Sequence, residues 1–199
     1  MWRKPGAKPL RFRATEDFAI EEVAFAWRAR FLLLGPLALE VVDEFGKGAG
    51  RIRVKLLGLP LQTETGPEIA LGQAMRYLAE LAWVPQAIAG NRELEWRQIG
   101  ERQLEVATQV GPARAAVELE LDKAGDIIGA TGMRPRRGPG GEVQPTPWGG
   151  AFSGHTGFGN ARLPAAAETW WDLPDGRFVY WRGRVTEAKP LSSRPAAAA

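Results

Sequence analysis

The chain shows a repeated alternation between hydrophobic and charged positions. In residues 25–33 every odd position is hydrophobic, whereas Arg28 and Arg30 occupy even positions. Residues 37–45 and 51–56 alternate in largely the same way. Successive side chains of a strand point to opposite faces, so the pattern predicts three strands, each with one buried and one charged face.

The same alternation predicts how these strands pair. With a loop at Leu34–Pro36 the hydrophobic faces stay together when Arg30 lies opposite Glu40, and a turn at Gly46–Ala49 places Glu40 opposite Lys55. A register shift of one residue would turn every side chain to the other face. We therefore expect the acidic strand between the two basic ones, where it neutralises much of their charge.

One helix is predicted after these strands. Gly66-Pro67-Glu68 resembles a helix start, with proline at the first helical position and an acidic side chain in the first turn. Hydrophobic residues from Leu71 to Leu81 recur at three- and four-residue spacing, and Pro85 ends the pattern. The hydrophobic stripe of this helix is expected to pack on the sheet.

Alternation returns after the helix and predicts further strands. These are residues 94–98, 103–110, 113–121, 148–152, 165–173 and 177–186. Residues 134–147 contain Arg134, Arg136 and Arg137 among glycines and prolines, which predicts a long basic loop. Short connections favour an antiparallel meander. The expected fold is α+β, mainly antiparallel β, with about ten strands in a curved, half-barrel-like meander packed on one long helix.

The last two predicted strands are joined by Pro174-Asp175-Gly176-Arg177, a strong signal for a two-residue hairpin turn. That turn places Trp171 opposite Tyr180 and Trp170 opposite Trp181. Aromatic pairs are therefore expected on both faces of this hairpin.

The expected organisation is one domain at residues 20–188. Residues 1–19 include five basic residues by position 13, and we expect them to be poorly ordered, as we do the tail at residues 189–199. No hydrophobic run has the length of a membrane span or a signal peptide. A cytoplasmic location is expected, unless a leader has been removed.

Composition narrows the possible chemistry. The 199 residues include no cysteine, a single histidine (His155) and eight tryptophans, and the net charge is only +3. Without cysteine the chain has no disulfides, thiolate nucleophiles or Cys-ligated metal sites, and one histidine excludes sites that need two imidazoles. The glycine-rich stretches follow no strand-to-helix transition, so they are not phosphate loops. No metal or cofactor is expected, and no motif names a reaction.

Several segments resemble a known family. They are Arg-Tyr-Leu-Ala-Glu-Leu-Ala-Trp-Val-Pro at residues 76–85, Pro-Thr-Pro-Trp-Gly-Gly at 145–150 and Tyr-Trp-Arg-Gly at 180–183. Their order and spacing, over about residues 20–187, resemble a bacterial family known only as a domain of unknown function, which implies no established activity. The strand–helix–strand order is also similar to the lipoprotein-carrier half-barrels, in which helices plug a curved sheet over an apolar cavity.

The first functional hypothesis is a non-enzymatic binding protein. Many large hydrophobic residues and tryptophans share one sheet face that a single helix must cover, which favours an apolar pocket under the helix. The partner would be a lipid-like or other hydrophobic small molecule; the oligomeric state stays open. The candidate ligand-binding residues are Arg76, Tyr77, Trp83, Trp148, Glu168, Trp170, Trp181 and Arg182.

The second hypothesis is an enzyme of unknown reaction. Asp43, Glu168 or His155 would act as acid or base beside Arg76 or Arg182. Asp43 lies on the hydrophobic side of its strand, and a buried acid requires a partner, so structural ion pairs with these arginines are the competing interpretation. The glycines and hydroxyl residues around His155 predict an exposed loop.

The third hypothesis is a nucleic-acid-binding module. It would use Arg134–Arg137, the basic N-terminal residues and exposed tryptophans. Because the charges of the sheet neutralise one another, the sequence favours a small molecule over nucleic acid as the partner.

Overall fold

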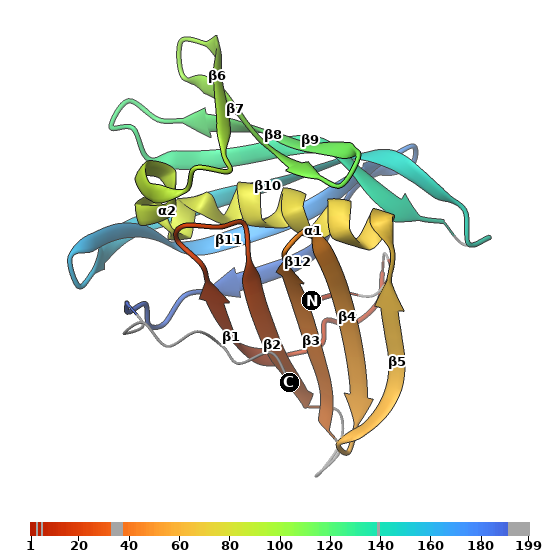
Figure 1. Ribbon diagram of the computed structural model, residues 1–199. Coiled ribbons are helices and arrows are strands. Elements are labelled where there is room, and N and C mark those ends of the chain that lie inside the picture. The colour runs from red at the N-terminus through yellow and green to blue at the C-terminus, as the bar shows by residue number, and fades with distance from the viewer. Residues whose placement is uncertain (3, 5, 33–37, 139, 191–199) are drawn as a thin grey trace.

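Two antiparallel sheets enclose helix α1 in the computed structural model (Figure 1). The structure describes residues 1–190 except 3, 5, 33–37 and 139. The five-stranded sheet, sheet A, runs in chain order through β1 (Phe12–Phe18), β2 (Phe25–Leu32), β3 (Ala38–Gly46), β4 (Ala49–Leu56) and β5 (Leu59–Thr65). The expected α+β, mainly antiparallel class is therefore confirmed.

The seven-stranded sheet, sheet B, is also a simple meander. It contains β6 (Glu95–Gly100), β7 (Gln103–Val110), β8 (Ala113–Leu121), β9 (Ile127–Arg137), β10 (Val143–Phe158), β11 (Ala161–Leu173) and β12 (Gly176–Arg184). The described residues thus form twelve strands in two open sheets, where a single curved sheet of about ten was expected. The helical segment between β5 and β6 separates the two sheets.

The predicted register of sheet A is confirmed. Arg30 pairs with Glu40, and Glu40 pairs with Lys55, so the acidic strand β3 lies between two basic strands. Alternation was sufficient here because one face of each strand is buried, which leaves a single register that keeps the hydrophobic faces together. The loop expected at Leu34–Pro36 lies outside the described residues.

Sheet A begins earlier than expected. β1 pairs with β2 along its whole length, although its residues belong to the segment predicted to be poorly ordered. Phe12 packs against Trp27 and Phe31, with ring centroids 6.0 and 5.3 Å apart. Charged residues between Phe12 and Phe18 hid the alternation, because one of them, Glu16, faces inward.

Helix α1 (Pro67–Ala79) continues into the 3₁₀ turn η1 (Glu80–Trp83), which α2 (Pro85–Gly90) follows. The expected stripe is buried, but so is the polar side, including Gln73 and Tyr77. Sheet A covers that second side. The sequence shows only one hydrophobic stripe on this helix, so a packing partner on only one side was expected. Among the described residues, no helix is both long and hydrophobic enough to cross a bilayer.

The basic segment 134–147 is a strand hairpin and not the expected loop. Arg137 of β9 pairs with Val143 of β10, and the pairing continues back along both strands. The guanidinium of Arg134 lies over the Trp148 ring at 4.8 Å, and that of Arg136 lies over the Trp171 ring at 5.8 Å. Arginines that stack on indoles occupy inward strand positions, which a hydrophobic–polar pattern does not reveal.

The hairpin of β11 and β12 has a different register from the expected one. Leu173 pairs with Gly176, and Trp171 therefore lies opposite Phe178. A register shift follows, because Trp170 pairs with Val179 whereas Thr169 pairs with Trp181. The extra residue of this bulge is Tyr180.

The bulge places both Tyr180 and Trp181 on the inner face of sheet B. Tyr180 stacks with Trp171 at 5.9 Å, and Trp181 packs on Phe12 of sheet A at 6.2 Å. Trp170 faces away from α1 with no aromatic partner from β12. The prediction that Trp170 and Trp181 pair on the outer face is therefore wrong. The one inserted residue moves every later side chain of β12 to the face opposite to the expected one.

Candidate functional site

Arg76 of α1 is the centre of a cluster of ion pairs between the helix and sheet A. Its Nη2 lies 2.7 Å from Oε1 of Glu16, its Nη1 2.8 Å from Oδ2 of Asp43, and its Nε 2.9 Å from Oε1 of Glu80. The four side chains are only 13–16 % exposed. The structure thus shows the ion pair between Asp43 and Arg76 that the competing interpretation expected.

Strand register explains why these groups meet. Glu16, Trp27 and Asp43 are direct neighbours across β1, β2 and β3, so the two carboxylates flank the indole. The guanidinium of Arg76 lies over Trp27 at 5.1 Å and over Phe25 at 4.9 Å. The aromatic rings supply a floor, and the carboxylates fix the guanidinium from both sides.

The charges of this cluster do not balance, because three carboxylates surround one guanidinium. Burial raises the pKa of Glu16 well above its usual value; the attraction of Arg76 opposes this rise, and Glu80 and Asp43 add to it. Burial alone would lower the pKa of Arg76, but the nearby carboxylates raise it. Buried Oε2 of Glu80 has no partner within the described residues, and a proton on Glu16 would supply a donor there.

We expect Glu16→Gln to change the pH dependence of stability. Folding raises the pKa of Glu16, so the folded protein binds this proton more tightly than the unfolded chain does. Its stabilising contribution is complete below pH 4.5, the ordinary value, and declines as pH rises toward the raised pKa. Urea unfolding across this range should show the variant gaining stability relative to the wild type. A constant difference between the two proteins would contradict the assignment.

Tyr77 is fully buried between α1 and the β1–β2 connection. Its hydroxyl donates to the carbonyl of Ala19 at 2.8 Å and accepts from Nδ2 of Asn91 at 3.1 Å. Burial, the main cause, raises the pKa of Tyr77 to about 12. The hydroxyl therefore anchors the β1–β2 connection and Asn91 to the helix.

Trp83 and Trp181 fill the space between η1 and the two sheets. Trp83 donates its indole N–H to the carbonyl of Pro164 at 2.9 Å and meets Phe152 edge-on at 5.2 Å. Trp181 lies 6.5 Å from Trp83. On the hydrophobic stripe of the helical segment, Ala74, Leu78 and Leu81 are fully buried.

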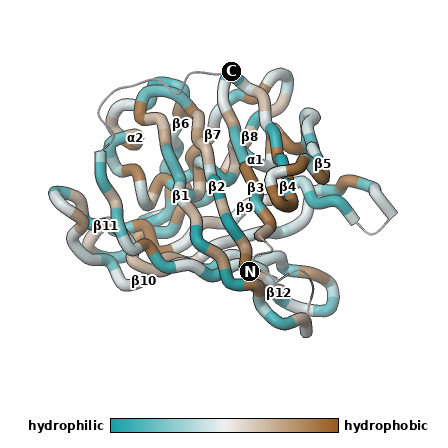
Figure 2. The backbone as a smooth tube through the Cα atoms, turned by 90° about the horizontal axis from the view of Figure 1, so that it is seen from below, coloured by the Kyte–Doolittle hydropathy of each residue, from teal (hydrophilic) through white to brown (hydrophobic). Residues whose placement is uncertain are grey.

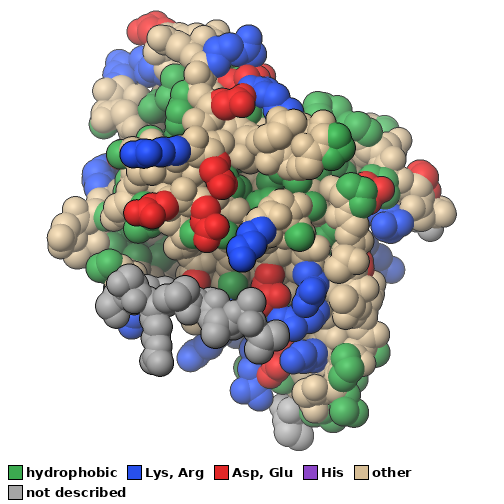
Figure 3. All heavy atoms as spheres, viewed as in Figure 1, with side chains coloured by type: hydrophobic (Ala, Val, Ile, Leu, Met, Phe, Trp, Pro, Cys, Tyr) green, Lys and Arg blue, Asp and Glu red, His purple; other side chains and the backbone are tan. Residues whose placement is uncertain are grey.

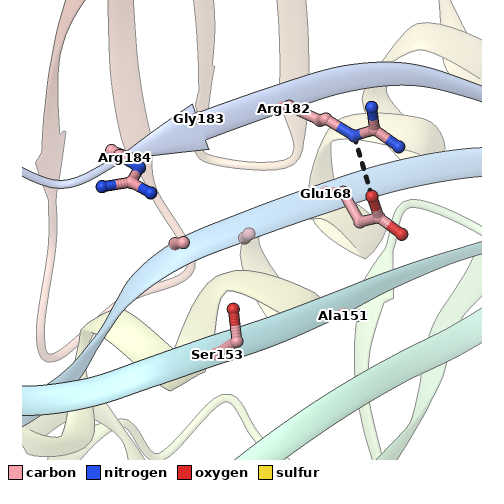
Figure 4. Close-up of a pocket in the computed structure, with 8 residues that line it drawn as sticks. Ala151, Ser153, Glu168, Arg182, Gly183 and Arg184 are labelled. Carbon is pink, nitrogen blue, oxygen red and sulfur yellow. Dashed lines mark hydrogen bonds and ion pairs between the residues drawn. The ribbon is translucent and has the colours of Figure 1, made fainter.

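Glu168 and Arg182 lie on the face of sheet B that points away from α1 (Figure 4). Trp170 shares this face, because it is two residues from Glu168 on the same strand. Glu168 and Arg182 form an ion pair at 2.9 Å beside an open hollow of about 490 Å³. Trp170 packs under the guanidinium of Arg177 at 4.2 Å. These three candidates are separated by the sheet from Arg76, Tyr77 and Trp83.

His155 belongs to β10 and not to the expected loop. It pairs with Pro164, is half-buried, and its Nε2 lies 3.1 Å from the carbonyl of Ile127. The structure does not bring His155 together with Asp43 or Glu168. Asp43 belongs to the Arg76 cluster, and Glu168 lies on the outer face of sheet B. In the described ranges, no group of three or more His, Cys, Asp or Glu side chains is arranged to hold a metal ion.

A cleft of about 270 Å³ between the N-terminal half of α1 and the two sheets is the place where polar and aromatic groups converge. We call it the arginine–aromatic cleft. It is lined by Ile52, Glu64, Glu68, Ile69, Gly72, Gln73, Arg134, Pro135, Arg136, Arg137, Val143, Trp171 and Tyr180. Among these lining residues, the sequence suggested a binding role only for Arg134, Arg136 and Arg137, and the suggested partner was nucleic acid.

Tyr180 organises the polar side of this cleft. Its oxygen lies 3.0 Å from the indole nitrogen of Trp148 and 3.4 Å from Nη1 of Arg134. Both of these groups are donors, so the Tyr180 oxygen accepts, and its hydrogen is left to donate to a third group. Trp148 is buried behind this pair and holds Tyr180 and Arg134 in place.

The arginines of the cleft lack carboxylate partners. Within the described part of the chain, neither Arg134 nor Arg136 forms a salt bridge, although twelve such bridges form elsewhere. Each guanidinium is half-buried and stacks on an indole. Stacked, half-buried guanidiniums with unused donors can bind a carboxylate or phosphate.

A family model described as a family of unknown function (DUF6544) matches residues 1–183. The chain belongs to this family. The resemblance found in the sequence is thereby confirmed, and the match includes the N-terminal residues that were expected to lie outside it. No curated protein and no solved structure matches the chain.

Two glycines in the segments 145–150 and 180–183 make room for tryptophans. A Cβ at Gly149 would lie 2.8 Å from Cζ2 of Trp170 and 3.0 Å from the carbonyl of Ala130, and a Cβ at Gly183 would overlap the Trp181 ring. These motif residues therefore support the positions of aromatic side chains. The arginine–aromatic cleft lies next to the motifs, and its sequence signal was the spacing of Arg134 and Arg136 along one strand face.

Proposed function

We propose that this protein is a non-enzymatic binding protein for a small amphipathic molecule with a hydrophobic body and an anionic head. The ligand would lie in the arginine–aromatic cleft. The observation that carries this proposal is that Arg134 and Arg136 are without carboxylate partners in the described residues, next to the Tyr180 hydroxyl hydrogen. Three donor groups that converge on one space favour a carboxylate or phosphate.

The charge of the cleft supports an anionic ligand. Arg134, Arg136 and Arg137 face Glu64 and Glu68, which gives three positive charges against two negative ones, a net charge of +1. The arginines all belong to β9, whereas the acids lie in β5 and the first turn of α1. An anionic head is therefore expected to contact β9 and not the opposite wall.

The remaining walls suit a short hydrophobic body. Ile52, Ile69 and Val143 line the cleft together with the ring of Trp171. The volume of about 270 Å³ is near the lower end of the range for small-molecule sites, which begins at about 300 Å³. A short-chain acid fits such a space better than a complete phospholipid.

Binding of octanoate and octanol compares an anionic head with a neutral one on the same body. We expect the wild-type protein to bind octanoate about tenfold more tightly than octanol, as one charge-assisted hydrogen bond contributes about 1.5–3 kcal/mol. Arg136→Gln should remove about tenfold of the octanoate affinity and leave octanol binding unchanged. Isothermal titration calorimetry measures all of these affinities.

Arg114→Gln is the matched control, since Arg114 is also on sheet B but pairs with Glu105 at 2.9 Å, away from the cleft. It should leave octanoate binding unchanged. If octanoate does not bind, or binds equally to wild type and Arg136→Gln, the proposed anionic site is wrong.

A further inference from the structure

Four strongly exposed leucines gather at one end of sheet A. Leu32, Leu57, Leu59 and Leu61 are 64, 62, 72 and 64 % exposed. Their strand ends adjoin, because Leu32 pairs with Ala38, and the Leu57 amide donates to the Ala38 carbonyl at 3.5 Å. We call these four residues the leucine tip.

The figures place the leucine tip away from α1. The β4–β5 turn is at the lower end of sheet A in Figure 1, whereas the helix crosses the upper end. Figure 2 looks at this lower end and shows hydrophobic stretches at β3 and β4. In Figure 3 hydrophobic side chains are exposed at the same end, below a group of Lys and Arg side chains. Helix α1 therefore does not cover the tip.

The backbone at the tip is unusual for a leucine. Leu57 and Gly58 form a two-residue turn with φ angles of 52° and 80°, a conformation in which asparagine followed by glycine is strongly preferred. Lys47-Gly48, at the other end of β4, forms the corresponding turn with φ angles of 52° and 72°. The Leu57 side chain is 62 % exposed, so it gains little from burial in the fold to offset this backbone strain. A gathering of four such exposed leucines is typical of an interaction site.

The sheet face behind the tip is basic. The nearest row of outward side chains across the sheet contains Arg13, Arg30, Glu40 and Lys55. Three positive charges and one negative charge give this row a net charge of +2. None of the three basic residues forms a salt bridge with a described residue, whereas Arg28 in the next row pairs with Asp17 at 2.8 Å. The uncompensated positive charge thus lies next to the leucines.

We propose that the leucine tip inserts into the surface of a membrane that contains anionic lipids. The leucines would enter the boundary between headgroups and acyl chains, while Arg13, Arg30 and Lys55 would contact the negative headgroups. All four leucines are more than 60 % exposed, at the end of β2, in the β4–β5 turn and in β5, so they protrude and do not line a groove. This shape suits a fluid lipid surface better than the side chain of a protein partner. This inference is independent of the arginine–aromatic cleft.

Sedimentation with lipid vesicles tests the proposal. We expect the protein to bind vesicles of equal parts phosphatidylcholine and phosphatidylglycerol at low salt, and to bind phosphatidylcholine alone at least about tenfold more weakly. The double variant Leu57→Asn, Leu61→Thr should lose about tenfold or more of the affinity for the mixed vesicles. Asparagine is favoured in this turn, so the variant should remain folded, which urea unfolding verifies.

Lys47→Asn is the matched control, because it places asparagine at the corresponding position of the turn at the other end of β4. It should bind the mixed vesicles like the wild type. Wild-type protein that stays in the supernatant, or a double variant that sediments normally, would overturn the proposal. So would a wild-type dimer that the double variant abolishes without any vesicle binding, since the tip would then contact a second copy of the chain.

Discussion

Replacing Arg76 with methionine is expected to lower the free energy of unfolding by about 3–5 kcal/mol. Arg76 is bonded to Glu16, Asp43 and Glu80, and its loss leaves three carboxylates in a largely buried space without a counter-charge. Methionine keeps much of the volume and the packing on Trp27, so the loss measures charge and not a cavity. Urea unfolding near neutral pH measures the change.

Two companion variants separate charge from geometry. Glu16→Gln should be far milder at neutral pH, because burial raises the pKa of Glu16 and favours its protonated form, which glutamine resembles. Arg76→Lys keeps the charge but cannot direct nitrogen donors at three separate carboxylates, so an intermediate loss is expected. Equal stability of Arg76→Met and wild type would show that the cluster does not hold α1 on sheet A.

The second large effect is expected for Trp148→Ala, at about 3–5 kcal/mol. Trp148 is only 4 % exposed, and its removal leaves a cavity behind the arginine–aromatic cleft. It also removes the indole on which Arg134 stacks and the indole N–H that donates a hydrogen bond to the Tyr180 oxygen. Thermal or urea unfolding measures the loss, and octanoate affinity should fall in the same variant because Arg134 is no longer held.

Trp148→Phe is the control for this prediction. Phenylalanine retains a ring beneath Arg134 but has no donor for Tyr180, so the expected loss is about 1 kcal/mol. If Trp148→Ala and Trp148→Phe are equally stable, packing of the indole contributes little. The hydrogen bond to Tyr180 would then be the main contribution of this residue.

The candidate site was only partly visible in the sequence. Arg76, Tyr77, Trp83 and Trp148 were predicted as ligand-binding residues, and in the structure their polar contacts are with other parts of the fold. Trp171 was predicted only as half of an aromatic pair with Tyr180, and the bulge at Tyr180 has no local signal. The convergence of the β9 arginines with β12 depends on three successive strand pairings, β9–β10, β10–β11 and β11–β12, which periodicity along one strand does not encode.

The sequence by itself determined the elements whose two sides differ sharply in polarity. Alternation in β2, β3 and β4 fixed both their existence and their register, because only one pairing keeps hydrophobic faces together. Only the tertiary structure decided that a second sheet covers the polar side of α1. Arg76 and Glu16 look like surface residues in a linear pattern, and they can be buried only because they bond to each other across the fold.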